Sequence, residues 1–310
     1  MKKILITGGA GYIGSMLSTE LVMQGYEVTV IDKLEYKKNS LDHLFFFKNF
    51  KFIKEDVTNK IFIKKIIKKF DIVIPLAALV GAPLCDKKPK EAELVNFECI
   101  KDIVHSLGNS QSIFYMNSNS GYGYGEKNSY CDETSELRPI SLYGRTKVLA
   151  EKEVVKAKNF AVLRLATVFG FSYRMRTDLL VNYYTKEAYF KKKIDIYEPN
   201  FRRNFVHVRD VVYAIIFFIK NFSKVKNDVY NFGLSNANIS KIQLARKIKE
   251  IIAGVKINII KGNDQDQRDY FVSNKKIEKK YCKAKISLLS GIMELKKIYE
   301  KGLEEQINNY

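Results

Sequence analysis

A glycine-rich turn near the N-terminus constrains the fold of this 310-residue chain more than any other feature. Residues 7–14 read TGGAGYIG and lie between a short apolar run and a stretch with helical character. Gly8, Gly11 and Gly14 have the G-x-x-G-x-x-G spacing that suits a tight turn, a close backbone approach to pyrophosphate and close helix packing. The free N–H groups at the start of a helix attract the same anion. The turn therefore predicts a dinucleotide-binding strand–turn–helix unit.

An acidic residue follows where such a unit contacts the cofactor ribose. Asp32 ends the second expected strand, 18 residues after Gly14. A carboxylate at this point accepts hydrogen bonds from both ribose hydroxyls and repels a 2′-phosphate, which favours NAD over NADP. Lys33 stands beside it and could attract such a phosphate. The sequence therefore favours NAD and leaves NADP open.

Strand and helix signals alternate through the first half of the chain. We expect strands at residues 4–6, 28–31, 52–53, 72–76, 112–116 and 161–165, and helices near residues 17–22, 96–106 and 146–156. Strands joined by right-handed crossover helices form a parallel sheet that is covered on both faces. The expected fold class is α/β, with a doubly wound parallel sheet of the Rossmann type.

This alternation ends after Thr167. An irregular stretch at residues 171–178 precedes short strands at residues 193–197 and 205–208, and a strand at residues 229–232 could rejoin the sheet. Because no Pro-rich linker separates the two halves, we expect interleaved domains. Residues 1–168 plus 204–234 are expected to bind NAD, and residues 169–203 plus 235–310 to form a smaller α/β domain for the substrate.

A tyrosine and a lysine form a candidate acid–base pair. Tyr143 and Lys147 have the spacing Y-x-x-x-K, and positions i and i+4 share one face of a helix. A nearby ammonium favours the phenolate, which lets the tyrosine act as a base. Ser118 follows an expected strand at the carboxyl edge of the sheet, where open α/β sheets bind ligands. Its hydroxyl could bond the same substrate oxygen, and a helix-capping serine is the alternative.

Charge and composition limit the kinds of partner. The formal charge is +19, from 53 Lys and Arg against 34 Asp and Glu. The lysines occur in short runs spread along the chain, which is typical of solvated helix faces, so we expect no nucleic-acid partner. No apolar run approaches the ~20 residues of a membrane span. The four cysteines share no C-x-x-C spacing. We therefore expect a cytoplasmic protein without a metal site or a membrane partner.

Over nearly its whole length, the chain resembles the extended short-chain dehydrogenase/reductases that modify nucleotide sugars. The resemblance rests, in this order, on TGGAGYIG, Asp32, EDV at 55–57, LAA at 76–78, Asn96, Ser118, Tyr143 with Lys147, and RNFVHV at 203–208. It implies an NAD cofactor and a homodimer. The implied NAD contacts are Gly8, Gly11, Tyr12, Ile13, Gly14, Asp32, Asp56 at the adenine, Val57, Leu76, Ala77, Ala78, Asn96 beside the nicotinamide half, Tyr143 and Lys147.

Departures from the family pattern narrow the reaction. Members that catalyse 4,6-dehydration carry an acidic pair directly after the serine, whereas this chain has Asn119 and Ser120. Decarboxylases usually carry an acid there and 3,5-epimerases a cysteine, and neither occurs. The family often has a histidine where Pro75 stands. The reactions left open are 4-epimerisation, net 4-oxidation and 4-keto reduction of a nucleotide-linked sugar.

The resemblance also implies substrate contacts. Arg203 and Arg268 match the two arginines that the family places on the substrate pyrophosphate. Weaker candidates for contacts to the sugar nucleotide are Thr167, Asn182, Arg174 and Arg176, and the last two could equally be solvated loop residues. Residues 76–86 and 164–182 resemble a capsule-pathway subgroup that acts on a GDP-linked heptose, which favours net oxidation at C4. A dinucleotide-binding regulator without turnover is the alternative from another class.

Overall fold

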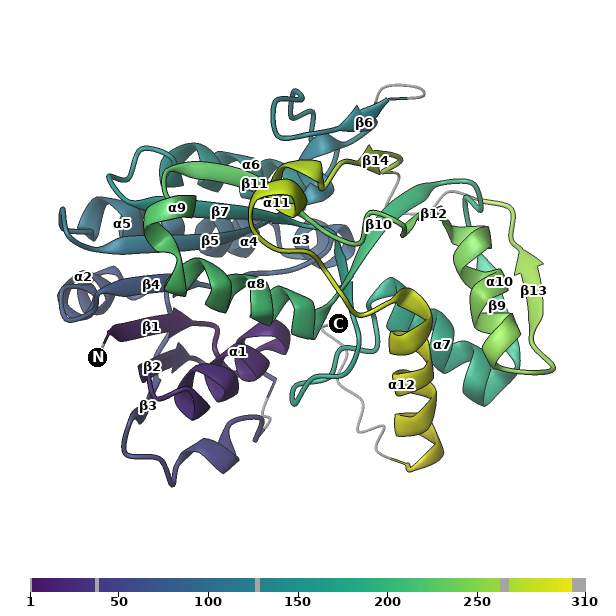
Figure 1. Cartoon of the computed structure of the whole chain (residues 1–310), viewed down its shortest axis with the longest axis horizontal. Coiled ribbons are helices and arrows are strands. Elements are labelled where there is room, and N and C mark those ends of the chain that lie inside the picture. Colours follow the sequence, from purple (N-terminus) through teal and green to yellow (C-terminus); the bar gives the residue numbers. More distant parts are fainter. Residues whose placement is uncertain (1, 37–38, 126–128, 263–267, 303–310) are drawn as a thin grey trace.

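The computed structural model describes residues 2–36, 39–125, 129–262 and 268–302. Within these ranges, seven strands form one parallel sheet in the order β11–β7–β5–β4–β1–β2–β3 (Figure 1). The strands are β1 (Lys3–Thr7), β2 (Glu27–Asp32), β3 (Phe50–Lys54), β4 (Ile72–Pro75), β5 (Ser112–Ser118), β7 (Phe160–Leu165) and β11 (Asp228–Phe232). The expected doubly wound sheet is confirmed, and the late strand β11 rejoins it beside β7.

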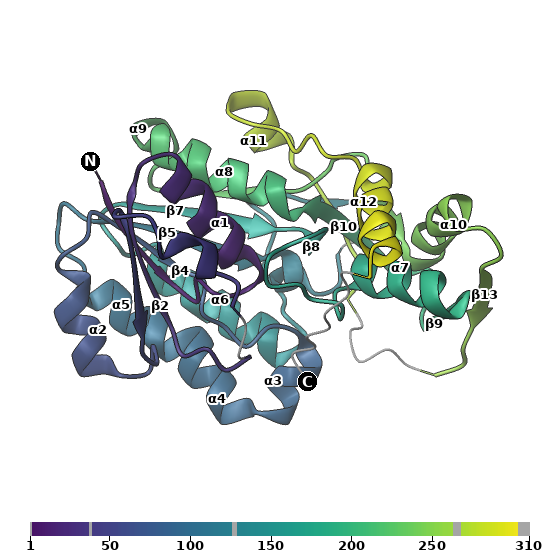
Figure 2. The ribbon, with the colours of Figure 1, turned by 90° about the horizontal axis from the view of Figure 1, so that it is seen from below.

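Helices cover both faces of this sheet, as Figure 2 shows. One face carries α1 (Tyr12–Met23) and α8 (Val208–Lys220), and the other carries α2 (Lys60–Ile67), α5 (Cys99–Ser106) and α6 (Leu142–Val154). Successive side chains of a strand point to opposite faces. Ile4 and Ile6 therefore pack with α1 and α8, whereas Leu5 packs with the other three helices. Burial on both faces explains why the strands are continuous apolar runs.

A second, mostly helical part lies beside the sheet, on the right of Figure 1. It contains α7 (Leu180–Lys191), α10 (Lys241–Ile251) and α12 (Leu288–Glu300), with β9 (Lys193–Ile196) paired to β13 (Lys256–Ile259). Between the two parts, β10 (Arg202–His207) pairs with β8 (Thr167–Phe169) and β12 (Asn238–Ser240). The short pair β6 (Tyr130–Cys131) and β14 (Phe271–Val272) lies at the top of Figure 1, above β10.

Short elements complete the described chain. They are the helices α3 (Ala82–Lys87), α4 (Pro89–Glu93), α9 (Phe222–Val225) and α11 (Lys275–Lys280), the 3₁₀ turns Asp42–Leu44 and Asn119–Tyr122, and a π-helical segment, Leu94–Glu98. Within the described ranges, the structure contains no helix with the length and apolar character that crossing a membrane requires.

Several boundaries differ from the expectation. The strand expected at residues 205–208 ends at His207, because the His207 ring accepts a hydrogen bond from the Arg209 N–H at 3.2 Å and caps α8. The helix expected near residue 146 begins at Leu142, because the Ser141 hydroxyl caps its first turn. Strand β8 falls within a stretch that the sequence did not assign.

Candidate active site

A cavity of about 460 Å³ opens where β1, β2, β4 and β5 end, between the sheet and the helical part. Most of the expected site residues line it: Gly8, Gly11, Tyr12, Ile13, Gly14, Asp32, Asp56, Val57, Leu76, Ala77, Ala78, Ser118, Tyr143, Lys147, Thr167, Arg174, Arg176, Arg203 and Arg268. Residues expected to contact a dinucleotide and residues expected to contact a substrate therefore share one cavity.

Two expected contacts, Asn96 and Asn182, lie behind the cavity wall instead. The Asn96 side chain accepts from the Leu79 N–H at 2.8 Å and donates to the Leu79 carbonyl at 2.9 Å. The Asn182 side chain accepts from the Gly170 N–H at 3.0 Å and donates to the Arg176 carbonyl at 2.8 Å. Both side chains are buried. Neither side chain faces the cavity. Each one instead fixes the backbone of a residue that lines it, Leu79 for Asn96 and Arg176 for Asn182.

The glycine turn packs so closely that side chains are excluded. A Cβ on Gly14 would lie 2.3 Å from the Gly8 carbonyl oxygen, and Gly8 has a φ of +71° with its Cβ position 2.4 Å from the Ala77 nitrogen. Helix α1 begins within this stretch, at Tyr12, and the Ser15 N–H donates to the carbonyl of the N-cap residue Gly11 at 2.9 Å. The turn and the free N–H groups of α1 therefore fit a pyrophosphate group at the cavity wall.

Asp32 is held in a fixed orientation beside this turn. Its carboxylate accepts hydrogen bonds from the N–H groups of Ala10 (3.0 Å) and Leu34 (2.9 Å). Burial raises the pKa of Asp32, and these two bonds oppose the rise. Lys33 instead forms ion pairs with Glu35 at 2.7 Å and Glu91 at 3.1 Å. Because the Lys33 ammonium is already paired with two carboxylates, it is poorly placed to bind a 2′-phosphate.

Helix α6 presents Tyr143 and Lys147 to the cavity. The Lys147 ammonium donates to the Met116 carbonyl at 2.8 Å and lies 4.1 Å from the ring centroid of Tyr115. Burial lowers the pKa of Lys147 to about 7, and Glu151 opposes this fall. Burial also raises the pKa of Tyr143, while the guanidinium groups of Arg268 and Arg176 and a hydrogen bond with Ser118 favour its phenolate. Two cations from segments that the sequence analysis expects at the substrate, Arg176 and Arg268, therefore favour the phenolate of Tyr143.

Ser120 also lines the cavity. The sequence indicated only that this position lacks the acid found in dehydratases. Its hydroxyl lies 2.7 Å from the Ser118 hydroxyl and accepts a hydrogen bond from the Arg268 guanidinium. Ser120 therefore links the expected catalytic serine to an expected pyrophosphate ligand. The link joins positions 148 residues apart, so no local sequence pattern could have indicated it.

The two arginines expected at the pyrophosphate lie side by side. Arg203 is 2% exposed and donates to the backbone carbonyl of Arg268 and to that of Arg202, the latter at 2.8 Å. Its guanidinium carbon lies 5.8 Å from the ring centroid of Tyr270. Both residues line the cavity, and guanidinium groups suit phosphate oxygens.

Arg174 and Arg176 are not solvated, so that alternative is wrong for both. Only 3% of Arg174 and 6% of Arg176 are exposed. Arg176 forms a bidentate ion pair with Asp178. The Arg174 guanidinium lies 4.2 Å from the ring centroid of Tyr36 and interacts electrostatically with Asp32. Burial lowers the pKa of Arg174 to about 10. Arg174 therefore lies near Asp32 rather than at a separate sugar pocket. Its aromatic partner, Tyr36, was not expected from the sequence.

Comparisons with known proteins agree with this geometry. A family model described as "NAD dependent epimerase/dehydratase family" matches residues 4–233. UDP-glucose 4-epimerase of Lactobacillus helveticus is 28% identical over 291 residues, which cover 85% of this chain and 87% of that protein. dTDP-D-glucose 4,6-dehydratase of Mus musculus is 25% identical, with 99% and 91% covered. The crystal structure of UDP-glucose 4-epimerase from Thermotoga maritima with UDP-glucose matches at 25% identity and a TM-score of 0.84, covering 97% of this chain and 100% of that one.

Proposed function

The chain belongs to the NAD-dependent epimerase/dehydratase family, and we propose that it uses NAD to oxidise C4 of a nucleotide-linked sugar. One observation carries the proposal. Ser118, Tyr143 and Lys147 line the same cavity as the glycine turn with Asp32 and as the paired arginines. A cofactor site, an acid–base group and cations for a substrate pyrophosphate are therefore available to one bound substrate.

In this mechanism, the protein residues bind the sugar and move one proton. Arg203 and Arg268 bind the pyrophosphate, with Thr167 as a further polar contact. Ser118 bonds the C4 hydroxyl, and Tyr143 removes its proton as a general base. The Lys147 ammonium, the Arg268 guanidinium and the Arg176 guanidinium stabilise the phenolate. Bound NAD supplies the acceptor for the hydride that leaves C4.

The cofactor residues follow from the same arrangement. The turn from Gly8 to Gly14 binds the pyrophosphate of NAD, and Asp32 binds the adenosine ribose. Asp56, Val57 and residues 76–78 also line the cavity. Asp56 and Val57 would contact the adenine, and residues 76–78 the rest of the dinucleotide. We assign Arg174 to the cofactor rather than to the sugar, because it lies over Tyr36 and close to the Asp32 carboxylate. A guanidinium there can pair with a dinucleotide phosphate.

The proposed substrate is GDP-manno-heptose and the product its 4-keto form, in surface polysaccharide biosynthesis. The support is the resemblance of residues 76–86 and 164–182 to the GDP-manno-heptose 4-dehydrogenase of bacterial capsule pathways. Residues 119 and 120 carry no acid that could protonate a leaving hydroxyl, which disfavours 4,6-dehydration. We also propose that two copies form a homodimer, and that residues 1–168 plus 204–234 form the NAD-binding domain. Residues 169–203 plus 235–310 then bind the nucleotide sugar, although residues 263–267 and 303–310 lie outside the described ranges.

The second candidate function is 4-epimerisation, or the related 4-keto reduction. It is favoured by the 28% identity to a UDP-glucose 4-epimerase over 85% of the chain. An epimerase begins with the same proton and hydride transfers but returns the hydride to the other face of C4. Reduced cofactor therefore does not accumulate.

The test follows the hydride. Enzyme, NAD and GDP-manno-heptose are mixed, NADH absorbance is recorded, and any ketone is trapped with borodeuteride. We expect NADH formation together with deuterium at C4. Inverted C4 without NADH or label would establish epimerisation instead. A parallel reaction with UDP-glucose shows whether the nucleotide preference is correct, because turnover of UDP-glucose alone would contradict the GDP assignment.

A further inference from the structure

Helix α6 carries a buried acid that the proposed mechanism does not use. Glu151 follows Tyr143 and Lys147 at intervals of four residues, so all three share one face of the helix. Only 5% of Glu151 is exposed. A buried carboxylate is costly unless it is paired and hydrogen-bonded, so its partners should indicate what it does.

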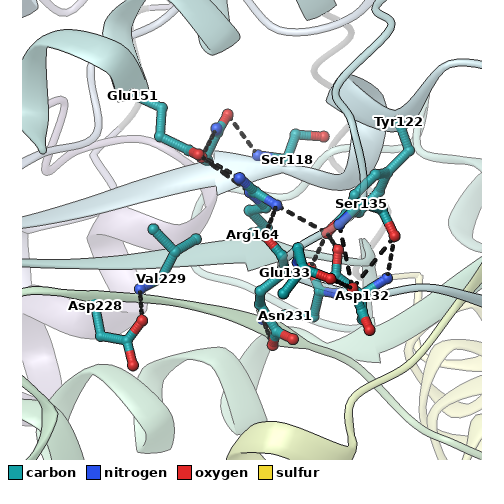
Figure 3. Close-up of polar contacts among 12 residues, drawn as sticks. Ser118, Tyr122, Asp132, Glu133, Ser135, Glu151, Arg164, Asp228, Val229 and Asn231 are labelled. Atoms are coloured by element: carbon teal, nitrogen blue, oxygen red, sulfur yellow. Dashed lines mark hydrogen bonds and ion pairs between the residues drawn. The ribbon is translucent and has the colours of Figure 1, made fainter.

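The charge partner of Glu151 is Arg164 on β7. The Arg164 guanidinium donates to one carboxylate oxygen through Nη2 at 2.6 Å and to the other through Nε at 3.1 Å (Figure 3). Both side chains are about 7% exposed. Arg164 also donates to the Tyr122 hydroxyl at 3.0 Å, which connects the pair to Asn231 on β11. The carboxylate is therefore fixed in position by a rigid, buried network.

A second contact leads from Glu151 to the active site. The Asn117 side-chain amide donates to the Glu151 carboxylate, and its carbonyl oxygen accepts from the Ser118 N–H at 2.8 Å. Because a carboxylate cannot donate, this contact fixes which end of the Asn117 amide faces Ser118. The orientation of Ser118 thus depends on the carboxylate of Glu151, although the two residues share no direct contact in Figure 3.

The same carboxylate acts on Lys147. The groups that act on this ammonium are the Tyr115 ring and the Met116 carbonyl on β5, Glu151 on α6 and the Cys85 thiol on α3. Across the cavity, Arg176 and Arg268 act on Tyr143. Burial disfavours the ammonium, and Cys85 remains a neutral thiol because burial raises its pKa to about 12. Glu151 is therefore the neighbouring anion that favours the charged form of Lys147.

We propose that Glu151, held by Arg164, is a positioning residue that orients Ser118 through Asn117 and stabilises the Lys147 ammonium. This inference rests on the proposed function, since it assigns a role in the same acid–base site. Glu151 is not among the residues that line the cavity, so it acts through its neighbours. Its two effects are separable, because one passes through the Asn117 amide and the other through charge.

The charge effect is tested by NMR on the protein without cofactor or substrate. Lysine labelled with ¹³C at Cε reports the Lys147 titration, and Lys147→Arg identifies its signal. In Glu151→Gln the carboxylate is lost while Arg164 stays charged, so the midpoint should fall furthest below the parent. In Glu151→Leu/Arg164→Met both charges are gone, and the midpoint should lie between the other two. Equal midpoints in all three proteins would overturn the charge effect.

The orientation effect is tested with Asn117→Ala, which leaves the ion pair intact. We expect kcat to fall roughly 10- to 100-fold with little change in KM and an unchanged Lys147 midpoint. A parent-like kcat would overturn the link to Ser118. Lys276→Met is the matched control, because it removes the 2.6 Å ion pair to Asp228 away from the cavity lining. It should change neither kcat nor the midpoint.

These measurements distinguish a failure of the proposed function from a failure of the role proposed for Glu151. If Glu151→Gln fails to fold because Arg164 is left unpaired, the double variant still decides the charge effect, since apolar replacement of both partners is often tolerated. If the parent turns over no nucleotide sugar, the proposed function fails, while the NMR midpoints still decide the role of Glu151. If the parent is active and neither midpoint nor kcat responds, Glu151 is purely structural.

Discussion

Tyr143 depends on its neighbours because burial and charge act on it in opposite directions. Burial raises its pKa and so disfavours the phenolate, whereas Arg268, Arg176 and the hydrogen bond with Ser118 favour it. Two of these three groups come from the part of the chain that is proposed to bind the substrate. Seating a substrate pyrophosphate on Arg268 would therefore change the electrostatics at the base as well as hold the sugar.

Replacing Tyr143 with phenylalanine should remove the base and leave the cavity intact. We expect kcat to fall roughly 10²–10⁴-fold, the usual contribution of a positioned acid–base group. NAD binding should persist, because the glycine turn and Asp32 are unchanged. NADH absorbance and an NAD titration measure the two effects. Tyr183→Phe is the control, since Tyr183 lines the same cavity, and near-normal turnover by Tyr143→Phe would refute the assignment.

The paired arginines should act mainly on binding. Arg203→Ala and Arg268→Ala each lose a charge-assisted bond worth roughly 1.5–3 kcal/mol, which should appear as a higher KM. Arg203→Ala should be the more severe, because Arg203 also supports the Arg268 backbone. Arg209→Ala, whose side chain is 53% exposed, is the control. If both variants bound nucleotide sugar as tightly as the parent, the pyrophosphate would lie elsewhere.

At the scale of elements, the β1–α1 turn joins fold to function. Gly8 packs on the backbone that follows β4, and Gly14 packs on Gly8. The same close packing brings the first N–H groups of α1 to the cavity wall. A side chain in this turn would therefore disturb the sheet and the anion site together.

Gly14→Ala tests this dependence. The new Cβ would lie 2.3 Å from the Gly8 oxygen and 2.6 Å from the Gly9 Cα. Because these are backbone atoms, relief requires movement of the turn, at a cost of about 1–3 kcal/mol. We expect a lower Tm and loss of NAD binding by calorimetric titration. Gly108→Ala is the matched control, with its nearest atom at an ordinary 3.5 Å. Parent-like NAD affinity in Gly14→Ala would contradict the assignment of this turn to the NAD pyrophosphate.

At the scale of the whole molecule, the sheet and the helical part share packing. Two apolar cores, one between the sheet and helices α1 and α8 and one in the helical part, both contact Ile13, Met16, Val168 and Ala284. The chain also passes between the parts more than once, since β8 and β10 lie between them while β11 returns to the sheet. Neither part can lose its packing without disturbing the other.

We therefore expect one cooperative thermal transition for the ligand-free protein, followed by circular dichroism and tyrosine fluorescence. NAD at 100 times its Kd should stabilise the whole molecule by about 2.7 kcal/mol. Both probes should shift together, because the cofactor site adjoins both cores. Two separate transitions, of which NAD moves only the first, would contradict the shared packing.

Features defined within short segments could be predicted from the sequence alone. The glycine turn, Asp32 at the end of β2, and Tyr143 with Lys147 on one helical face each depend on spacings of a few residues and on regular backbone geometry. Alternating apolar runs and helices were sufficient for the doubly wound sheet, because a parallel sheet buried on both faces requires that pattern. Boundaries were less exact where a cap such as Ser141 or His207 decided them.

Only the tertiary structure decided how distant segments meet at the cavity. It brought Ser120 to Arg268, Arg174 to Tyr36 near Asp32, and Glu151 to Arg164 and Asn117, while it placed Asn96 and Asn182 behind the wall. These contacts depend on where the stretch after β8 runs and on which strand lies beside β5. Spacing along the chain determines which side chains share a local face, but packing between elements far apart in sequence determines which side chains touch.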